Sequence, residues 1–266
     1  MDAHSFQLSH EELLLLLGLL GLPTPLALGP RPTEGYDQIG LGIALAAATG
    51  SLLARELVQL DTEALYPPEP VRALAELARS VALADSCLVL VERRANERQV
   101  AHLTSCEGLV VLHTSPLPRT HRLMLLGSHA EATAWLVATL DAHPEQPRPV
   151  VTVEVDVLAT TLDAIDRGDV AIAHRSLMTS GLESDLASQF LYAVGPQPAR
   201  FAFGAMRGMT TGLPPQVCGA VALVGTSGTW WSPSDGSSTT LTLHPVDGTR
   251  LRNELATMTA WLQAVA

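Results

Sequence analysis

The segment around Ser227 is the part of the sequence that comes closest to a catalytic pattern. Residues 225–229 (GTSGT) follow an apolar run, as a hydrolase nucleophile follows its strand. The nucleophile elbow of hydrolases needs a glycine two residues after the serine, where this sequence has Thr229. A turn between two strands explains the same glycines. The hairpin turn is therefore the favoured interpretation, and a small hydrolase that uses Ser227 remains an alternative.

Metal-binding and acid–base residues are present but lack the spacing of a site. The three cysteines form no CxxC pair. His102 and His113 are expected on adjacent strands, yet two imidazoles lack the third ligand of a zinc site. Paired carboxylates such as Asp163 and Asp166 are expected to be solvated. We therefore predict no catalytic residue, no metal ligand and no cofactor.

The charge of the chain argues against nucleic acid as a partner. The formal net charge is −11, from 27 acidic and 16 basic residues, and every basic residue is arginine. Such a chain repels phosphate backbones and anionic lipid. The absence of lysine also excludes Schiff-base chemistry. Three widely spaced cysteines without a disulfide pattern indicate a reduced, cytoplasmic protein.

One apolar run, residues 13–28, has the composition of a signal or membrane segment. The residues before it are acidic and include no arginine, whereas a signal peptide begins with positive charge. Pro23 ends the run short of a bilayer span. Ser9 and Glu12 form a capping box, and Gly21 suits the left-handed position after a helix. We therefore predict a buried helix and no membrane insertion.

A second, longer helix is expected from Ile39 to about Leu60. Apolar and small residues recur there at heptad-like spacing, which predicts that one face of the helix is packed. The residues of this face are Ile43, Ala46, Gly50, Leu53, Leu57 and Leu60. Glycines at positions 40, 42 and 50 allow a neighbouring element to approach closely.

The rest of the chain runs twice through the same order of helices, strands and a final helix. Strands are expected within residues 87–126 and again within 200–243, with short turn-like separators that favour antiparallel pairing. Each set precedes a helix with an Ala-Trp-Leu triplet. We predict a single α/β (α+β) domain, residues 1–266, with a central, mostly antiparallel sheet flanked by helices. Its two related halves, about 1–143 and 150–266, would be joined by a quasi-two-fold axis.

This order of elements resembles the EspG family, the secretion-associated chaperones of ESX (type VII) systems. The resemblance covers nearly the whole chain and is carried by LSHEELLLLLGLLGLPTPLAL, PEPVRALAELA, CLVLVERRANERQVAHL and VEVDVLATTLDAI. Members of the family have a quasi-two-fold α/β arrangement and keep secreted substrates of the PE–PPE type soluble before export. The resemblance implies a non-enzymatic cytoplasmic chaperone or adapter, and a secreted helical protein as its client.

Two surfaces are candidates for binding a partner. The predicted hairpin at 93–98 concentrates positive charge, and arginine is favoured at interfaces, although a solvated turn explains the same residues. Its candidate residues are Arg93, Arg94, Glu97 and Arg98. The resemblance implies a second surface in the helical region 158–194, with Leu182, Leu186 and Phe190 as its candidate residues. A self-associating structural or regulatory module, such as a homodimer that pairs sheet edges, remains a further alternative.

Overall fold

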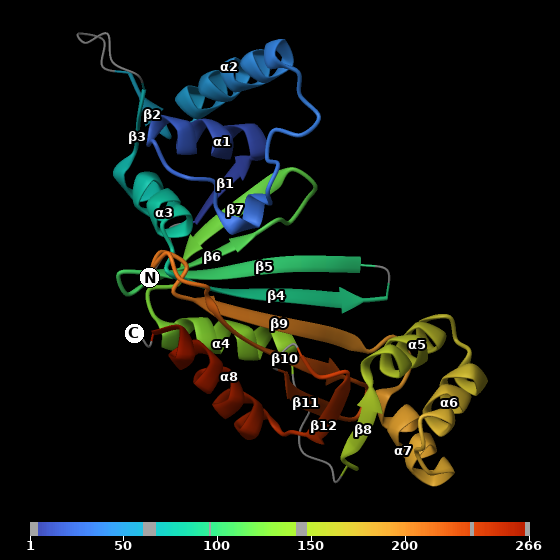
Figure 1. The fold of residues 1–266 in the computed structure, drawn as a ribbon. Helices are drawn as coiled ribbons and strands as arrows, with labels where there is room; N and C mark the ends of the chain where they lie inside the picture. Colours follow the sequence, from blue (N-terminus) through green and yellow to red (C-terminus); the bar gives the residue numbers. More distant parts are fainter. Residues whose placement is uncertain (1–4, 61–67, 96, 142–147, 235–236, 264–266) are drawn as a thin grey trace.

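Ten antiparallel strands form one continuous sheet in this computed structural model, which describes residues 5–60, 68–95, 97–141, 148–234 and 237–263 (Figure 1). The order across the sheet is β1 (Ser5–Ser9), β7 (Thr120–Leu125), β6 (Leu109–Thr114), β5 (Glu97–Cys106), β4 (Ser86–Arg94), β9 (Ala199–Arg207), β10 (Gln216–Val224), β11 (Thr229–Ser234), β12 (Thr240–Pro245) and β8 (Val151–Glu154). The predicted antiparallel meanders are confirmed in both halves.

Helices cover the two ends and the centre of the sheet (Figure 1). At the β1 end lie α1 (His10–Leu19), α2 (Gln38–Ala54) and α3 (Arg72–Ala82). At the β8 end lie α5 (Val155–Asp166), α6 (Val170–Thr179) and α7 (Ser184–Val194). Two further helices, α4 (His129–Leu140) and α8 (Gly248–Gln263), pack against each other beside the central strands. A small ladder of β2 (Val58–Gln59) and β3 (Glu69–Pro70) adjoins the first group.

The two halves of the sheet have the same strand order when they are followed outward from the centre. One half runs β4, β5, β6, β7 and β1, and the other runs β9, β10, β11, β12 and β8. In each half three helices follow the outermost strand, and one helix follows the meander. The predicted quasi-two-fold arrangement is therefore present. A duplication with halves at about 1–143 and 150–266 stays a prediction, and residues 143–147 of the expected linker lie outside the described residues.

Helix α1 begins and ends as its sequence indicates. The Ser9 hydroxyl accepts the Glu12 N–H at 3.1 Å, and the Glu12 carboxylate accepts the Ser9 N–H at 2.7 Å, which completes the capping box. Gly21 has φ +62°, and Leu22 N–H donates to Leu17 O at 2.9 Å, as in a Schellman cap. Among the described residues we find no helix with the length and apolar character needed to span a bilayer.

Helix α2 packs with the face opposite to the predicted one. It ends at Ala54, before Glu56 takes a left-handed conformation (φ 56°), and does not reach Leu60. Ala48 and Leu52 are buried on the α1 side, whereas Ile43, Ala46 and Gly50 of the predicted face are exposed. Leu53 and Leu57 of that face are partly buried against the core. The prediction was wrong because α2 is apolar on all sides, so the spacing of its residues does not identify the side that contacts the protein.

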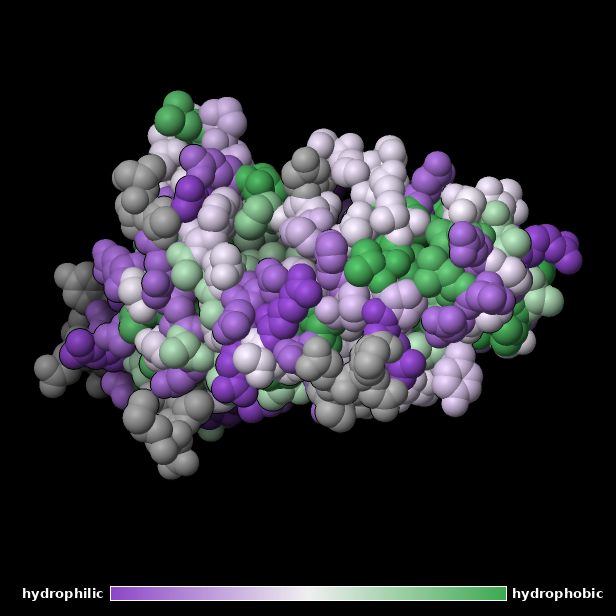
Figure 2. All heavy atoms as spheres, turned by 90° about the horizontal axis from the view of Figure 1, so that it is seen from below, coloured by the Kyte–Doolittle hydropathy of each residue, from purple (hydrophilic) through white to green (hydrophobic). Residues whose placement is uncertain are grey.

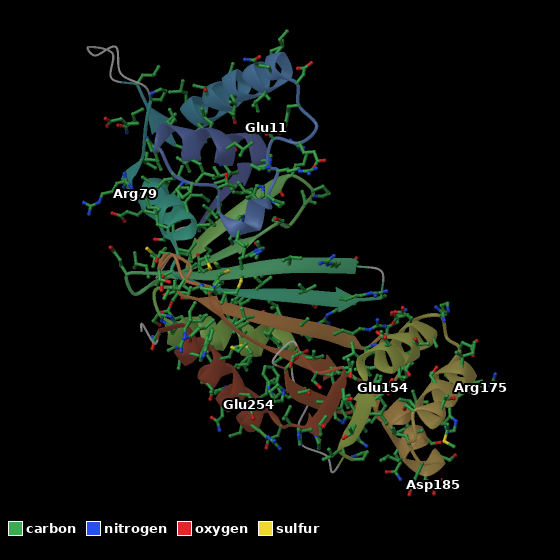
Figure 3. The ribbon with its side chains drawn as sticks, in the orientation of Figure 1. Glu11, Arg79, Glu154, Arg175, Asp185 and Glu254 are labelled. Atoms are coloured by element: carbon green, nitrogen blue, oxygen red, sulfur yellow. The ribbon has the colours of Figure 1, made fainter. Side chains whose placement is uncertain are left out.

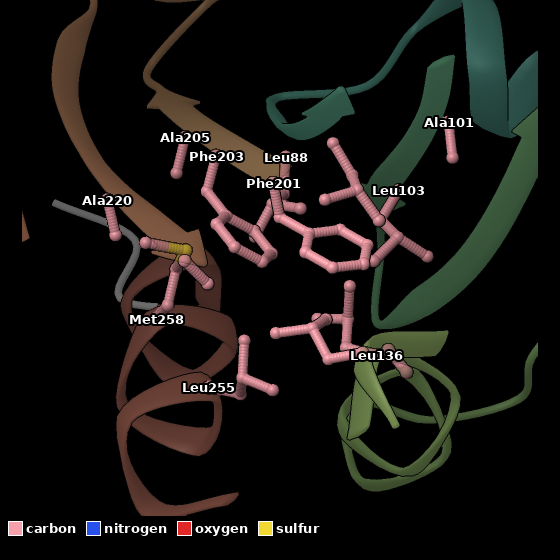
Figure 4. Packing of buried hydrophobic residues seen from close by; sticks show 14 of the residues in the cluster. Leu88, Ala101, Leu103, Leu136, Phe201, Phe203, Ala205, Ala220, Leu255 and Met258 are labelled. Atoms are coloured by element: carbon pink, nitrogen blue, oxygen red, sulfur yellow. The ribbon is translucent and has the colours of Figure 1, made fainter. Parts of the chain in front are cut away.

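The hydrophobic core consists of three clusters, one for each group of helices. The central cluster packs Phe201 and Phe203 of β9 against Leu136 of α4 and Leu255 of α8 (Figure 4). A second cluster joins α1, α2 and α3 to β6 and β7. The third joins α5, α6 and α7 to β8, β11 and β12, with Trp230 as its largest side chain. This third cluster forms the base of the candidate functional site.

Candidate protein-binding site

A groove of about 870 Å³ lies at the β8 end of the molecule. It is bordered by α6, by the C-terminal part of α7 and by the turn between β10 and β11. Its apolar lining consists of Ile165, Val170, Leu191, Tyr192, Gly195 and Pro196. Figure 2 shows hydrophobic side chains gathered over this end of the molecule. The size and the lining are typical of a site for apolar groups of a ligand or partner.

The turn between β10 and β11 forms one wall of the groove because it docks onto the end of α7. Thr226 N–H donates to Val194 O at 3.1 Å, and Ser227 N–H donates to Ala193 O at 3.1 Å. These bonds satisfy two carbonyls that a helix end leaves unpaired. A Cβ atom on Gly225 would lie 2.6 Å from Ala193 O, so only glycine permits this approach.

Buried aromatic rings and one arginine hold the groove in shape from below. Phe190 of α7 and Trp230 of β11 are fully buried and meet edge to face, with ring centroids 5.1 Å apart. The Trp230 indole N–H donates to Pro149 O at 3.3 Å. Arg148 donates from Nε and Nη2 to Ser227 O, at 3.0 Å and 2.7 Å. The wall opposite α6 is therefore fixed by contacts between distant parts of the chain.

The rim of the groove carries exposed apolar side chains that no pattern in the sequence indicates. Tyr192 is 81% exposed and Val170 is 60% exposed. Val170 is the first residue of α6, directly after the turn that follows α5. Tyr192 follows buried Leu191 and carried no sequence signal of its own.

Ser227 lines the same groove, but the described residues do not arrange it as a nucleophile. Its hydroxyl oxygen is buried and has no hydrogen-bond partner among them. His174 also lines the groove, with Nε2 placed 3.1 Å from Ser188 Oγ and 3.3 Å from Ser184 O. The predicted hairpin is confirmed: β10 pairs with β11, and Gly225 N–H donates to Gly228 O at 2.9 Å.

The predicted helical residues do not line the groove. Phe190 is fully buried, Leu182 is buried and Leu186 is partly buried, all within the third core cluster. They belong to the packing of α7 and of the turn before it. A client that docks on this region meets the rim residues first, and contact with Leu182, Leu186 or Phe190 stays a prediction.

The predicted basic hairpin reaches the same end of the molecule. Arg93 pairs with Arg98 and Arg94 with Glu97 across β4 and β5, so these four residues lie on strands and not in a long loop. All four are exposed, Arg94 makes an ion pair with Glu92, and Asn96 at the tip lies outside the described residues. Their role in binding a partner stays a prediction.

An ion-pair network joins this hairpin to the helices beside the groove. Arg93 approaches Asp163 of α5 at 3.5 Å, and Arg200 of β9 lies 3.1 Å from the same carboxylate. Arg200 also bonds Asp166 and donates to Leu162 O at 2.7 Å. The expectation that Asp163 and Asp166 are simply solvated was wrong, because Arg200 is far away in sequence and its contact could not be foreseen.

The described residues contain no group of three or more His, Cys, Asp and Glu side chains arranged to hold a metal ion. His102 and His113 do face each other across β5 and β6, as predicted, with ring centroids 6.0 Å apart.

The surroundings of the groove are charged: Arg175 on α6 and Asp185 on α7 point away from the body of the molecule (Figure 3). The site therefore combines an apolar floor with a charged periphery, as protein interfaces do.

The ten-stranded sheet with its two helical ends is an EspG-like fold. In the comparison with solved structures, the chain is similar to a structure of the Mycobacterium tuberculosis type VII secretion system chaperone EspG5 in complex with a PE25–PPE41 dimer. The TM-score is 0.66 at 12% sequence identity, over 96% of this chain and 95% of the other. No family model and no curated protein matches the sequence.

Proposed function

We propose that this protein is a non-enzymatic cytoplasmic chaperone or adapter of type VII secretion. Its client would be a secreted helical protein, of the PE–PPE type or another, that it keeps soluble before export. The EspG-like fold supports this role, because the similar EspG5 structure holds a PE25–PPE41 dimer. The observation that carries the proposal is the apolar groove between α6, α7 and the β10–β11 turn.

The physical task of such a chaperone is to cover apolar surface that would otherwise aggregate. An amphipathic helical tip can place its apolar side chains into a groove of this kind. Val170 and Tyr192 on the rim are positioned to contact it first. The acidic surface of the chain keeps the complex soluble and favours clients with basic rims. Burial of the Ser227 hydroxyl favours this function over hydrolysis.

The groove is tested by placing charge on its rim. A Val170→Glu, Tyr192→Glu variant should bind the client at least about thirtyfold more weakly, because the loss of an apolar contact centre costs about 2 kcal/mol or more. The melting temperature should hardly change, since both side chains are exposed. The probe is a PE–PPE dimer, the class of partner present in the similar EspG5 structure, and affinity is measured by isothermal titration calorimetry.

Ile43→Glu is the matched control, because Ile43 is also an exposed apolar helix residue but lies at the opposite end of the molecule. This control should bind the client like the wild type. Equal binding by the groove variant would contradict the assigned site. Co-expression that leaves the client insoluble would contradict the chaperone itself.

The basic hairpin has a separate prediction. Reversing Arg93, Arg94 and Arg98 to Glu should weaken client capture in a pull-down and leave the melting temperature nearly unchanged. The ion pairs of Arg93 and Arg94 are about half exposed, and such pairs add little to stability. An unaltered pull-down would show that the hairpin does not touch the client, with the groove still open to its own test.

A further inference from the structure

Helix α2 presents an apolar face that the described residues do not cover. Its 17 residues include no Asp, Glu, Lys or Arg. One side is buried on α1, while the other leaves Ile39 76% exposed and Ile43 67% exposed. Figure 1 shows α2 as the outermost layer at its end of the molecule. A helix that is apolar on all sides is normally buried, so a partner is expected to cover it.

The exposed face of α2 is bulky in its first half and flat in its second. Ile39 and Ile43 are followed, on the same side of the helix, by Ala46 and Gly50. When a second α2 is laid antiparallel across a two-fold axis, Ile39 comes opposite Gly50 and Ile43 comes opposite Ala46. Each isoleucine then fills the space above a small residue, and the contact repeats at both ends, as a two-fold interface requires.

We propose that a second copy of this chain covers α2, through an antiparallel α2–α2 contact about a two-fold axis. The change from large to small side chains along the exposed face fits a second copy, because the face is then complementary to itself. Charge supports it as well: two chains of net charge −11 repel each other over most of their surfaces, but not where these uncharged helices meet. Small residues also let two helix axes approach to about 8 Å.

The contact is modest in size, which sets its expected strength. One helix pair buries less than the roughly 800 Å² per partner of a standard interface. We therefore expect a reversible dimer with a dissociation constant in the micromolar range. The groove lies at the opposite end of the molecule, so both copies keep it accessible (Figure 1). The dimer does not depend on the proposed chaperone function.

Sedimentation equilibrium of the full chain, from about 5 to about 300 µM, tests the interface. The wild type should change from monomer to dimer across this range. Ile43→Glu should raise the dissociation constant at least about tenfold, because it places a charge in the contact. Its melting temperature should match that of the wild type. A wild type that stays monomeric at the highest concentration, or an Ile43→Glu variant that still dimerises, would overturn the proposal.

The antiparallel register is tested separately, by variants that distinguish it from any other contact made through α2. Gly50→Ile should weaken the dimer at least about tenfold by opposing Ile39 with a second isoleucine. Its fold should be intact, since a Cβ at Gly50 meets nothing within 4 Å. The exchanged variant Ile39→Gly, Gly50→Ile should restore the wild-type dissociation constant to within about threefold. Failure of this rescue would overturn the register and with it the proposed contact.

Discussion

An Arg55→Ala variant is expected to lose about 3 to 5 kcal/mol of folding stability. Arg55 lies 3.0 Å from the Glu12 carboxylate, whose side chain is only 4% exposed. Glu12 also accepts the Ser51 hydroxyl at 2.6 Å and the Ser9 N–H at 2.7 Å. Without the guanidinium, a buried negative charge remains among hydrogen bonds that do not neutralise it. The loss therefore comes from the charge that is left behind, and not from the side chain that is removed.

The structure predicts an asymmetry between the two partners of this ion pair. Arg55 is 41% exposed, so in a Glu12→Ala variant water can still solvate it. Glu12→Ala should therefore cost less than Arg55→Ala, about 2 kcal/mol, for the lost capping box and hydrogen bonds to a charged group. The double variant should lose less than the sum of the two.

Equilibrium unfolding in urea measures these differences, and Arg72→Ala is the matched control. Arg72 makes an ion pair with Glu76 at 2.7 Å, but its side chain is 92% exposed, so its removal should not change the unfolding midpoint. If Arg55→Ala unfolds at the same urea concentration as Arg72→Ala, Glu12 does not rely on its partner and the assignment is wrong.

Elements that are determined by local chemistry could be predicted from the sequence. The capping box of Ser9 and Glu12 and the helix around the first Ala-Trp-Leu triplet (α4) are found where expected, because caps and helical spacing act over a few residues. The two matched sets of strands predicted the quasi-two-fold sheet for the same reason. Strands that are joined by short turns pair antiparallel, because a parallel connection needs a longer crossover.

Features that depend on contacts between distant residues could not be predicted. The ion pair between Arg200 and Asp163 joins residues 37 positions apart, and no residue near Asp163 in the sequence indicates it. The groove itself exists because Thr226 and Ser227 bond the end of α7, more than thirty residues earlier. The burial of Phe190, a candidate for binding a partner, could not be predicted either, because a helix packed on more than one side has apolar residues on each of these sides. Patterns show which residues are apolar, and only the fold decides which of them are covered.

A row of three histidines beside α1 gives the second large expected effect, a loss of stability in mild acid. His10 Nε2 lies 2.6 Å from Pro32 O, and a carbonyl only accepts, so this nitrogen carries the hydrogen. His10 Nδ1 then accepts from His121 Nε2 at 3.1 Å, and His121 Nδ1 accepts from His113 Nε2 at 2.9 Å. The carbonyl of Pro32 thereby sets the direction of the whole row when all three rings are neutral.

The two inner rings of this row, His113 and His121, resist protonation because they are buried. Burial, together with the charges of His121 and His102, lowers the pKa of His113 to about 3. Burial and the neighbouring His10 lower the pKa of His121 to about 4. A proton added to His121 Nδ1 would also face the N–H of His113 Nε2, so the hydrogen bond between these two nitrogens would be lost. Only His113 Nδ1 is left to accept a proton without reversing a bond, and it lies in the core.

The sign of the pH dependence follows from these pKa values. Imidazoles of the unfolded chain titrate near 6.5, so below that pH the unfolded state binds protons that the folded state does not. The free energy of unfolding is therefore unaffected by the titration of these histidines above pH 6.5. It decreases as the pH falls from 6.5 toward about 4. Glu11 acts in a lower window: burial alone would raise its pKa, but hydrogen bonds from Tyr36 and Arg119 lower it to about 2 from 4.5.

Unfolding free energies measured in urea at intervals from pH 7.5 to 4.5 should therefore report the histidines. Each buried histidine contributes a slope of about 1.4 kcal/mol per pH unit, or about 2.7 for His113 and His121 together. His113→Gln should remove about half of this slope, and adding His121→Gln should remove most of the rest. Glu11→Gln, the control, should keep the wild-type slope above pH 5. A wild-type stability that stays constant between pH 6.5 and 5 would show that the two rings accept protons in the folded protein, in which case the row is not held neutral by burial.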